Sequence, residues 1–313
     1  MPPGALIEGT PPVAANPWVL DCRGRMLDCR PGRPAHVMGV LNVTPDSFSD
    51  GGRYATRDAA LKRAEEMLAE GATILDVGGE STRPRGSAYG AGAAPVAPEE
   101  ELRRVIPVVE AISQRFPHAL ISVDTYKGEV AREALRAGAH LVNDVTGLRE
   151  GVGTARAAAD FGAPLVVMHA LGRPGTMPHE HRYTDVVEDV AENLARSVRT
   201  AEEEGVRHVV VDPGFGFGKT PAENLRLIGR LDRLVALGRP VLVGVSRKHT
   251  VGVVVGSAER PAPVGERLYG SLGLAAAAVL GGASIVRTHD VRPTAEVLRA
   301  LAAVRIATGA GAP

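Results

Sequence analysis

Polar side chains recur where short apolar runs end along this sequence. Eight runs rich in β-branched residues each finish on a charged or hydrogen-bonding residue. The residues at or beside these ends are Asn42, Asp76, Asp124, Asn143, Asp144, His169, Asp212, Ser246, Arg247, Lys248, Arg287 and His289. If the runs are parallel strands of a barrel, their carboxyl ends converge on one mouth. A lone carboxylate at a strand end is often only the N-cap of the next helix, but this many polar endings predict a polar cup.

The basic residues of the cup fall into two groups. Ser246–Lys248 follows the seventh run, and Arg287–His289 lies at the end of the eighth. In α/β barrels the loops after strands seven and eight supply the usual phosphate site. The two groups therefore predict that a phosphorylated small molecule binds at the C-terminal ends of the strands.

A glycine-rich turn follows the sixth run, with the sequence DPGFGFGK over residues 212–219. It lacks the spacing of a nucleotide-binding P-loop. Glycines at this place let the backbone and Phe217 approach a flat ligand closely. Core packing is the alternative for both Phe215 and Phe217.

Two long segments, Val43–Thr56 and Gly78–Pro98, follow the first two runs. Barrel loops of this length more often act as lids or binding loops than as passive connections. We expect both of them to lie over the cup.

The scaffold that positions these residues follows from the runs themselves. Short runs of β-branched residues suit strands that are buried on both faces, as in a parallel sheet. The runs are His36–Asn42, Ile74–Asp76, Leu120–Asp124, Leu141–Asp144, Leu165–His169, His208–Asp212, Val241–Ser246 and Ile285–His289. Segments of helical composition between them include Arg57–Glu70, Glu99–Phe116, Lys127–Ala137, Asp185–Glu204, Pro221–Ala236 and Thr294–Ile306. Several end at a glycine suited to a left-handed helix C-cap; these are Gly71, Gly138, Gly162, Gly205, Gly238 and Gly282.

This alternation predicts an α/β fold, a single (β/α)8 TIM barrel over residues 18–308. A doubly wound open sheet is the structural alternative. Residues Trp18–Cys29 are predicted to form a hairpin before the first barrel strand. Residues 1–17 and 309–313 are predicted to be flexible tails.

Composition excludes several classes of function. The 313 residues include 36 basic and 36 acidic side chains, so no net charge attracts nucleic acid or an anionic membrane. Aromatic residues make up 4% of the chain, which argues against a stacking platform for single-stranded nucleic acid. No stretch reads as a signal peptide or a membrane span. Cys22 and Cys29 are expected to be reduced thiols. We therefore expect a cytoplasmic protein that binds small molecules.

Several motifs in this chain resemble those of the dihydropteroate synthase family. They include NVTPDSFSDGG from Asn42, DVGGESTRP from Asp76 and DPGFGFGKT from Asp212. The others are Ser122–Thr125, Asn143–Gly147, Met168–His169, Ser246–Lys248 and Arg287–Val291. The matches run in order from about residue 36 to 292 and cover the whole predicted barrel.

The resemblance implies a transferase of folate synthesis. Its substrates would be p-aminobenzoate and a 7,8-dihydropterin carrying a 6-hydroxymethyl diphosphate, and its products dihydropteroate and diphosphate. A TIM barrel, Mg²⁺ dependence, a homodimer and inhibition by sulfonamides are implied as well. The amine of p-aminobenzoate is already unprotonated at neutral pH, so no strong general base is required. We expect a dissociative displacement in which the protein stabilises the departing diphosphate and a cation-like methylene carbon.

The resemblance also implies roles for individual residues. The pterin, whose edge of N–H donors suits a carboxylate, would contact Asp124, Asn143, Asp212, Lys248, Met168 and Phe217. The diphosphate would contact Asn42, Thr82, Arg83, Arg287 and His289. The p-aminobenzoate would contact Thr82, Arg83, Pro84, Phe48 and Ser246. Catalysis would fall to Asn42, Arg287, His289 and Lys248, with Asn42 also a ligand of Mg²⁺.

Two other functions are compatible with a pterin cup. A pterin-dependent methyltransferase would need no diphosphate pocket, so Thr82–Pro84 and the pair Arg287 and His289 favour the synthase. A non-catalytic pterin-binding paralogue would be expected to have lost loop or cationic residues, and no such loss is seen.

Some residues depart from the family pattern or keep two interpretations. Ala170–Gly172 stands where Met-Gln-Gly is usual, and His249–Thr250 where Ser-Phe is common. His169 can be satisfied by neighbouring backbone, and His179 and His181 are expected to be exposed loop residues rather than a metal pair. The small-residue segment Ser271–Gly282 suits either a dimer surface or close packing against the barrel.

Overall fold

The computed structural model describes residues 16–43, 52–80, 95–171 and 183–308. Eight parallel strands form one sheet in the order β8-β7-β6-β5-β4-β3-β10-β9. They are β3 (His36–Asn42), β4 (Ile74–Gly78), β5 (Leu120–Asp124), β6 (Leu141–Asp144), β7 (Leu165–Met168), β8 (Val209–Asp212), β9 (Leu242–Val243) and β10 (Ile285–Thr288). A parallel bridge between Val211 and Val241 joins the two ends of the sheet. The sheet is therefore a barrel, and the open doubly wound alternative is wrong.

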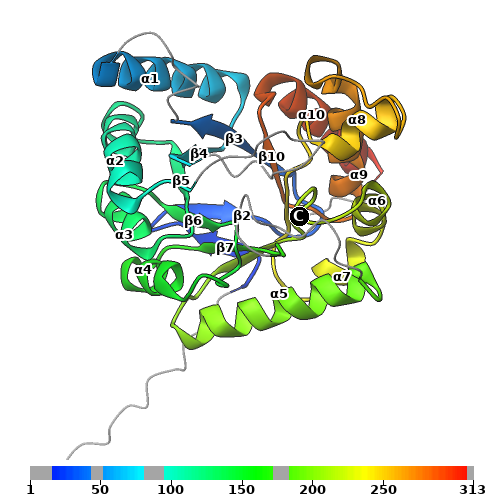
Figure 1. The fold of residues 1–313 in the computed structure, drawn as a ribbon, viewed down its shortest axis with the longest axis horizontal. Helices are drawn as coiled ribbons and strands as arrows, with labels where there is room; N and C mark the ends of the chain where they lie inside the picture. Colours follow the sequence, from blue (N-terminus) through cyan, green and yellow to red (C-terminus); the bar gives the residue numbers. More distant parts are fainter. Residues whose placement is uncertain (1–15, 44–51, 81–94, 172–182, 309–313) are drawn as a thin grey trace, which may run out of the picture.

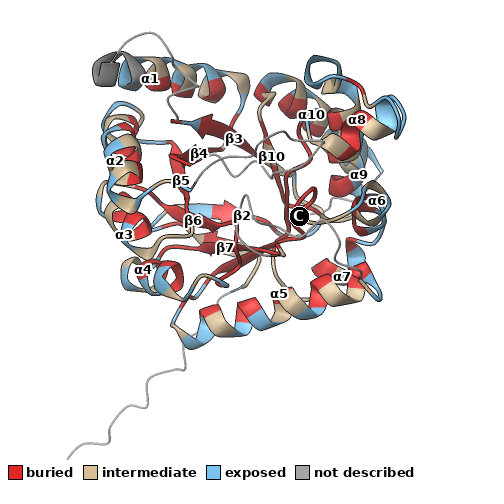
Figure 2. Cartoon of the chain, in the orientation of Figure 1, coloured by how far each residue is buried: buried red, intermediate tan, exposed pale blue. Residues whose placement is uncertain are grey.

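Helices surround the barrel (Figure 1). They are α1 (Gly52–Glu70), α2 (Pro98–Arg115), α3 (Gly128–Arg136), α4 (Gly153–Phe161), α5 (Val186–Glu203), α6 (Pro221–Gly229), α7 (Asp232–Val235), α8 (His249–Val255), α9 (Leu268–Leu280) and α10 (Val291–Ala307). Their buried residues face the strands and their exposed residues face outward (Figure 2). The (β/α)8 TIM barrel predicted from the sequence is confirmed.

The strands bury side chains on both faces, as their apolar sequences predict. Outward-facing residues such as Val77, Val123 and Val211 pack with the helices in one large core. The inward-facing layer at the opposite end from the cup takes one residue from each strand. These residues are Met38, Ile74, Leu120, Leu141, Val166, Val210, Leu242 and Ile285. Because side chains alternate along a strand, the residue two positions further along each strand also points inward, nearer the cup.

The predicted hairpin is present and closes the bottom of the barrel. Strand β1 (Val19–Asp21) pairs antiparallel with β2 (Met26–Asp28). Leu20, Leu27 and both cysteines are buried in the same cluster as the bottom layer of barrel residues. Cys22 and Cys29 are free thiols. The hairpin thus covers the end of the barrel opposite the polar cup.

The predicted helix ends are largely those observed. All six glycines expected to cap helices have positive φ, from 63° at Gly162 to 115° at Gly138. The predicted helix Pro221–Ala236 is instead two helices, α6 and α7, because the chain turns at Arg230 and Leu231. Helix α10 begins at Val291, three residues before the predicted start, and α1 begins at Gly52, inside the predicted first loop. No helix in the described parts of the chain is long and apolar enough to cross a membrane.

Both predicted tails fall largely outside the described residues. Asn16 is described, and its backbone and side-chain oxygens accept hydrogen bonds from Val19 and Trp18. These bonds tie Asn16 to the turn that leads into β1.

Candidate active site

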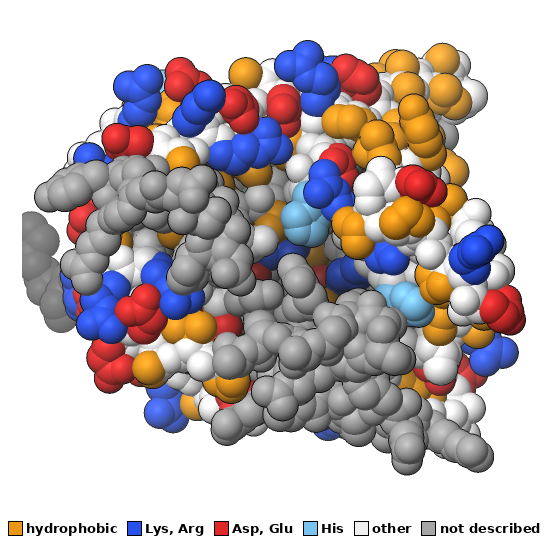
Figure 3. All heavy atoms as spheres, turned by 45° about the horizontal axis from the view of Figure 1, so that its top comes forward, with side chains coloured by type: hydrophobic (Ala, Val, Ile, Leu, Met, Phe, Trp, Pro, Cys, Tyr) orange, Lys and Arg blue, Asp and Glu red, His pale blue; other side chains and the backbone are white. Residues whose placement is uncertain are grey.

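The polar cup occupies the barrel interior at the carboxyl ends of the strands. On each strand, the residue two positions after the bottom layer also faces inward. This second inward-facing layer contains many of the predicted polar residues. Its members include Asp76, Ser122, Asn143, Met168, Asp212 and Arg287. Seen from this side, charged and histidine side chains lie next to one another between the grey segments (Figure 3).

Arg287 on β10 lies at the centre of the cup and bridges two carboxylates. Its Nε donates to Asp76 Oδ2 at 2.6 Å, and its Nη2 donates to Asp124 Oδ2 at 2.6 Å. Asn143 Nδ2 donates to the same Asp76 oxygen at 3.3 Å. Burial lowers the pKa of Arg287, but the charges of Asp76 and Asp124 outweigh it and raise the pKa overall. Arg287 is therefore a permanent cation at the floor of the cup.

Several acceptors in the cup have no partner among the described residues. These acceptors are Asp76 Oδ1, Asp124 Oδ1 and Ser122 Oγ, and all three are buried. Burial raises the pKa of Asp124 to about 7, although the charge of Arg287 lowers it. A buried oxygen without a donor is costly, so these atoms suit a ligand that presents several N–H groups.

Asp212 on β8 is the second buried carboxylate of the cup. Its Oδ1 accepts the backbone N–H of Gly214 at 2.7 Å, which fixes the carboxylate at the start of the glycine-rich turn. Burial raises the pKa of Asp212, and the nearby charge of Lys248 opposes that rise. Asp212 and Asp124 come from different parts of the barrel wall and supply acceptors from two directions.

The two phenylalanines of the turn have different roles. Phe215 is fully buried in the main core between strands and helices. Phe217 instead forms a small cluster with Met168, Val145 and Ala170 at the cup. Core packing is therefore confirmed for Phe215, whereas Phe217, which is also buried, lies in the cluster beside the cup. Its contact with a flat ligand stays a prediction.

Lys248 lies between the turn and the carboxylates. Its Nζ donates to the backbone oxygen of Phe215 at 2.5 Å and lies 4.4 Å from the centre of the Phe217 ring. Burial lowers the pKa of Lys248 to about 8, against the opposing charge of Asp212. Because an ammonium group has three donors, Lys248 still has donors for a ligand.

His289 belongs to the basic residues of the cup, but its surroundings lower its pKa. Burial, and then the charge of Arg287, lowers the pKa of His289 to about 4. Its Nδ1 lies 3.1 Å from Ser246 Oγ, which also accepts the His289 backbone N–H at 3.2 Å. At neutral pH the imidazole is therefore neutral and offers a hydrogen bond rather than a charge.

The lowered pKa of His289 predicts how stability depends on pH. The folded chain protonates this group near pH 4 and the unfolded chain near its ordinary value of 6.5. Between these values the unfolded chain binds more protons, so the free energy of unfolding falls as the pH is lowered. We expect the melting temperature to fall between pH 6.5 and pH 4, and to fall less in His289→Gln. An equal fall in both proteins would show that His289 is not held neutral by the fold.

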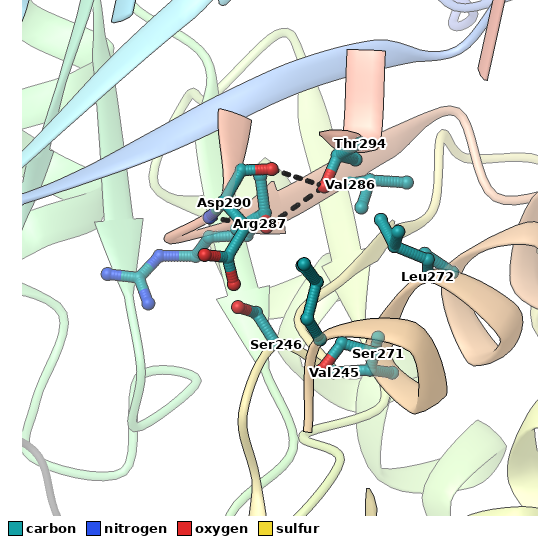
Figure 4. A pocket seen from close by; sticks show the side chains of 11 residues that line it. Val245, Ser246, Ser271, Leu272, Val286, Arg287, Asp290 and Thr294 are labelled. Carbon is teal, nitrogen blue, oxygen red and sulfur yellow. Dashed lines mark hydrogen bonds between the residues drawn. The ribbon is translucent and has the colours of Figure 1, made fainter. Parts of the chain in front are cut away.

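Ser246 and the end of β10 also border a narrow pocket on the α9 side (Figure 4). Its lining includes Val245, Val286, Leu272 and Thr294. The guanidinium of Arg287 points away from these side chains. The residues that follow β9 and those of β10 are thus divided between the cup on one side and helix packing on the other.

Asn42 is the predicted metal ligand and ends β3. Its side chain is exposed at the cup end of the strand. Among the described residues, no group of three histidine, cysteine or acidic side chains is placed to hold a metal ion. One carboxamide oxygen suits Mg²⁺, which keeps several waters and often binds together with substrate phosphates. The residues present therefore fit a metal that is held mainly by the diphosphate and water.

Several predicted residues lie outside the described part of the chain. They are Phe48, Thr82, Arg83, Pro84, His179 and His181. The roles given to them stay predictions. His169 is described and buried, and its ring packs against Tyr183 with 5.9 Å between ring centres.

A buried ionic cluster at the base of the second long segment is absent from the sequence predictions. Lys127 Nζ donates to Glu80 Oε2 at 2.5 Å and also to Glu101. Glu80 further accepts from Tyr126 OH at 3.1 Å and from the backbone N–H of Val96 at 3.2 Å. The side chain of Glu80 thus ties together the two described ends of the segment between residues 80 and 96. In the sequence, the position of Glu80 directly after the DVGG motif was the only indication of this cluster.

Glycine is required at position 214. Its φ is +65°, and a Cβ there would lie 1.8 Å from the backbone oxygen of His169. We expect Gly214→Ala to displace the turn and to weaken ligand binding and stability together. Gly162→Ala is the matched control, since Gly162 has φ +63° and nothing within 4 Å of the added Cβ. The control should cost only the left-handed penalty of about 1–2 kcal/mol. Equal melting temperatures for the two variants would contradict the clash.

The fold and the cup define a class of protein. The barrel has carboxylate oxygens that no described residue pairs, a buried arginine and lysine, and an aromatic side chain beside them. These features suit an enzyme for a flat, donor-rich, phosphorylated ligand. A family model described as "Pterin binding enzyme" matches residues 38–289. The chain belongs to this pterin-binding family, in its dihydropteroate synthase branch.

Individual relatives agree with this placement. The dihydropteroate synthase of Escherichia coli K12 is 47% identical over 270 residues, covering 86% of this chain and 91% of the relative. A Xanthomonas albilineans dihydropteroate synthase solved with 4-aminobenzoic acid has a TM-score of 0.81 and 43% identity, with 92% and 98% of the two chains covered. The same enzyme solved with 7,8-dihydropteroate has a TM-score of 0.77 and 40% identity, and the match covers 92% of this chain and 98% of that one. The Yersinia pestis enzyme solved with a sulfonamide drug has a TM-score of 0.81 and 43% identity, and the match covers 92% of this chain and 99% of that one.

Proposed function

We propose that this protein is a dihydropteroate synthase, a transferase that joins p-aminobenzoate to 6-hydroxymethyl-7,8-dihydropterin diphosphate with release of diphosphate. The observation that carries the proposal is the cup itself. Two buried carboxylates, Asp124 and Asp212, face the same space as the cations Arg287 and Lys248. Relatives of nearly the same length are named for this activity.

The pterin would bind through its donor-rich edge. A carboxylate accepts two parallel N–H bonds well, and Asp212 is fixed by Gly214 to receive them. Asp124 Oδ1 and Asn143 face the rest of the ring, and Lys248 retains donors for a ring carbonyl or nitrogen. Phe217 and Met168 supply an apolar wall for the ring face.

The reaction breaks the bond between the methylene carbon and the diphosphate oxygen and forms a bond from that carbon to the amine nitrogen of p-aminobenzoate. The amine loses a proton to solvent as the bond forms. Charge develops on the diphosphate before the new bond is complete, so fixed cations and donors lower the barrier most. Arg287 supplies a charge that needs no rearrangement, and neutral His289 and Asn42 supply hydrogen-bonding groups.

Mg²⁺ is part of the proposal, with Asn42 as its ligand from this chain. When bound, the ion would neutralise charge on the diphosphate oxygens. Removing divalent cations with a chelator is the direct measure of this requirement.

The p-aminobenzoate would lie at the outer end of the cup. Ser246 is the one described residue assigned to it, and its Oγ is engaged with His289. Contacts from Phe48, Thr82, Arg83 and Pro84, and inhibition by sulfonamides, are proposed from the family resemblance and from the sulfonamide-bound relative. A cytoplasmic location is proposed on the same basis.

A homodimer is proposed through the outer face of α9 and the segment before it. Ser271, Ala275 and Ala278 pack this helix against the barrel, so close packing is one of its roles. The same region exposes Tyr269 at 82%, Leu280 at 61% and Val264 at 53%. Large apolar side chains that gather on one region suit an association surface, and these three residues support the proposal on that ground.

We expect Leu280→Glu to shift the protein from dimer to monomer in sedimentation velocity measurements. Met26→Glu, which changes a similarly exposed residue on β2, away from α9, is the matched control and should remain dimeric. A dimeric Leu280→Glu protein would exclude this face.

The experiment that tests the function measures diphosphate release by the purified protein with dihydropterin diphosphate and Mg²⁺. Release that depends on p-aminobenzoate, with equal formation of dihydropteroate, is the expected result. Pterin binding without release would favour the non-catalytic paralogue. A methyl-group donor processed in place of the diphosphate substrate would favour the methyltransferase.

A further inference from the structure

Lys219 ends the glycine-rich turn and has no role in the proposed chemistry. Its Nζ donates to three backbone oxygens: Gly214 at 2.9 Å, Phe217 at 3.1 Å and His169 at 3.3 Å. Two of these belong to the turn and the third to the end of β7. An ammonium group has three donors, so all of the donors of Lys219 are used within the protein.

The turn needs such a clamp because its own backbone supplies little order. Gly214, Gly216 and Gly218 all have positive φ, between 65° and 82°. Glycines lose more conformational freedom on ordering than other residues. Without Lys219, the carbonyls of Gly214 and Phe217 would each lose a donor. Gly214 would keep the backbone N–H of Phe217 at 3.0 Å, whereas a buried Phe217 carbonyl left without a donor is costly.

Ligand-facing groups on two sides of the cup are held by this turn. The Gly214 N–H fixes the Asp212 carboxylate. The Phe215 carbonyl accepts from Lys248, and the Phe217 ring lies under the Lys248 ammonium. A shift of the turn therefore moves the carboxylate, the cation and the aromatic wall at once.

We propose that Lys219 is a positioning residue that holds the glycine-rich turn in the geometry that binds the pterin. It acts through Asp212 and Lys248 and touches neither the substrate nor the reacting atoms. Asn224 assists from the other side, since its Oδ1 accepts the Gly216 N–H at 2.7 Å while its Nδ2 contacts Thr250. The proposal rests on the proposed function, because it concerns the same pterin site.

The test compares Lys219→Met with the wild-type protein and with Lys62→Met. Methionine keeps an unbranched apolar side chain of similar length and removes every donor. Lys62 is exposed on α1, so its variant controls for the loss of a lysine charge. We expect Lys219→Met to weaken binding of dihydropterin diphosphate by about 10- to 100-fold, the scale of a small misplacement of binding groups. The KM for p-aminobenzoate should change less than about threefold, a split that simple destabilisation would not produce.

Two further measurements keep the outcomes distinct. Melting curves report whether Lys219→Met is folded; if it is not, Lys219→Gln, which has two shorter-reaching donors, decides by the same binding assay. Pterin affinity in a folded Lys219 variant equal to that of Lys62→Met would overturn the proposal. A wild-type protein that releases no diphosphate would instead overturn the proposed function, and pterin binding to the wild type would still allow the Lys219 comparison.

Discussion

Asp212→Ala is expected to abolish measurable binding of the dihydropterin substrate. The carboxylate is buried, fixed by the Gly214 N–H, and is the acceptor best placed for a donor-rich edge. Removing one partner of a buried, charged hydrogen-bonded pair costs about 3–5 kcal/mol. Since about 1.4 kcal/mol corresponds to a factor of ten, the affinity should fall by at least about 100-fold. Isothermal titration with dihydropterin diphosphate measures this directly.

The control for this prediction addresses charge balance. Asp212 also faces the amino groups of Lys219 and Lys248. Burial lowers the pKa of both lysines and the charge of Asp212 opposes that fall, so the loss of Asp212 favours their neutral forms. Asp212→Asn keeps the shape and one acceptor oxygen but removes the charge. We expect it to fold and to bind more weakly than wild type. Wild-type affinity in a folded Asp212→Ala protein would remove Asp212 from the pterin site.

Arg287→Ala is expected to lower kcat by about 100- to 1000-fold, the usual effect of losing one fixed donor to a developing negative charge. The KM for p-aminobenzoate should change much less, because the guanidinium lies on the floor of the cup with Asp76 and Asp124. Steady-state kinetics with each substrate varied in turn separate the two effects.

The Arg287 prediction needs a check on stability. The variant leaves two buried carboxylates without their cation, which is itself destabilising. Arg287→Lys retains a charge but cannot make the same forked contact, so it should fold more stably and still turn over slowly. Arg132→Ala, which breaks an exposed pair with Asp160, should leave kcat unchanged. A kcat in Arg287→Ala close to that of Arg132→Ala would mean that the cation does not act on the diphosphate.

Much of the barrel followed from local features of the sequence. Strands buried on both faces require continuous apolar runs, and helix ends at glycine require positive φ, so both are visible without the fold. The break between α6 and α7 was missed because residues 221–236 keep a helical composition through it. Helix α8 was missed because His249–Val255 is short and rich in β-branched residues, which favour strands in isolation.

The grouping of the strand-end residues in one cup was predictable, but their charges and contacts were not. Strand-end positions identified Asp124, Asp212, Lys248 and Arg287, since parallel strands must bring their carboxyl ends together. The glycine-rich motif included Lys219 without indicating that its ammonium would be used entirely by the backbone. That use depends on the carbonyl of His169, which lies 50 residues away in the sequence.

The sequence by itself determined the alternation of strands and helices, the capped helix ends and the polar character of the cup, because each depends on residue type and short-range spacing. Only the tertiary structure decided how the cup residues are paired. Arg287 meets Asp76 across 211 residues of sequence, and Phe215 and Phe217 separate into core and cup although they are two residues apart. It also decided that His289 is neutral, because its pKa is set by burial and by the neighbouring charge of Arg287. Ionisation and pairing are properties of the assembled surroundings, and those come from distant parts of the chain.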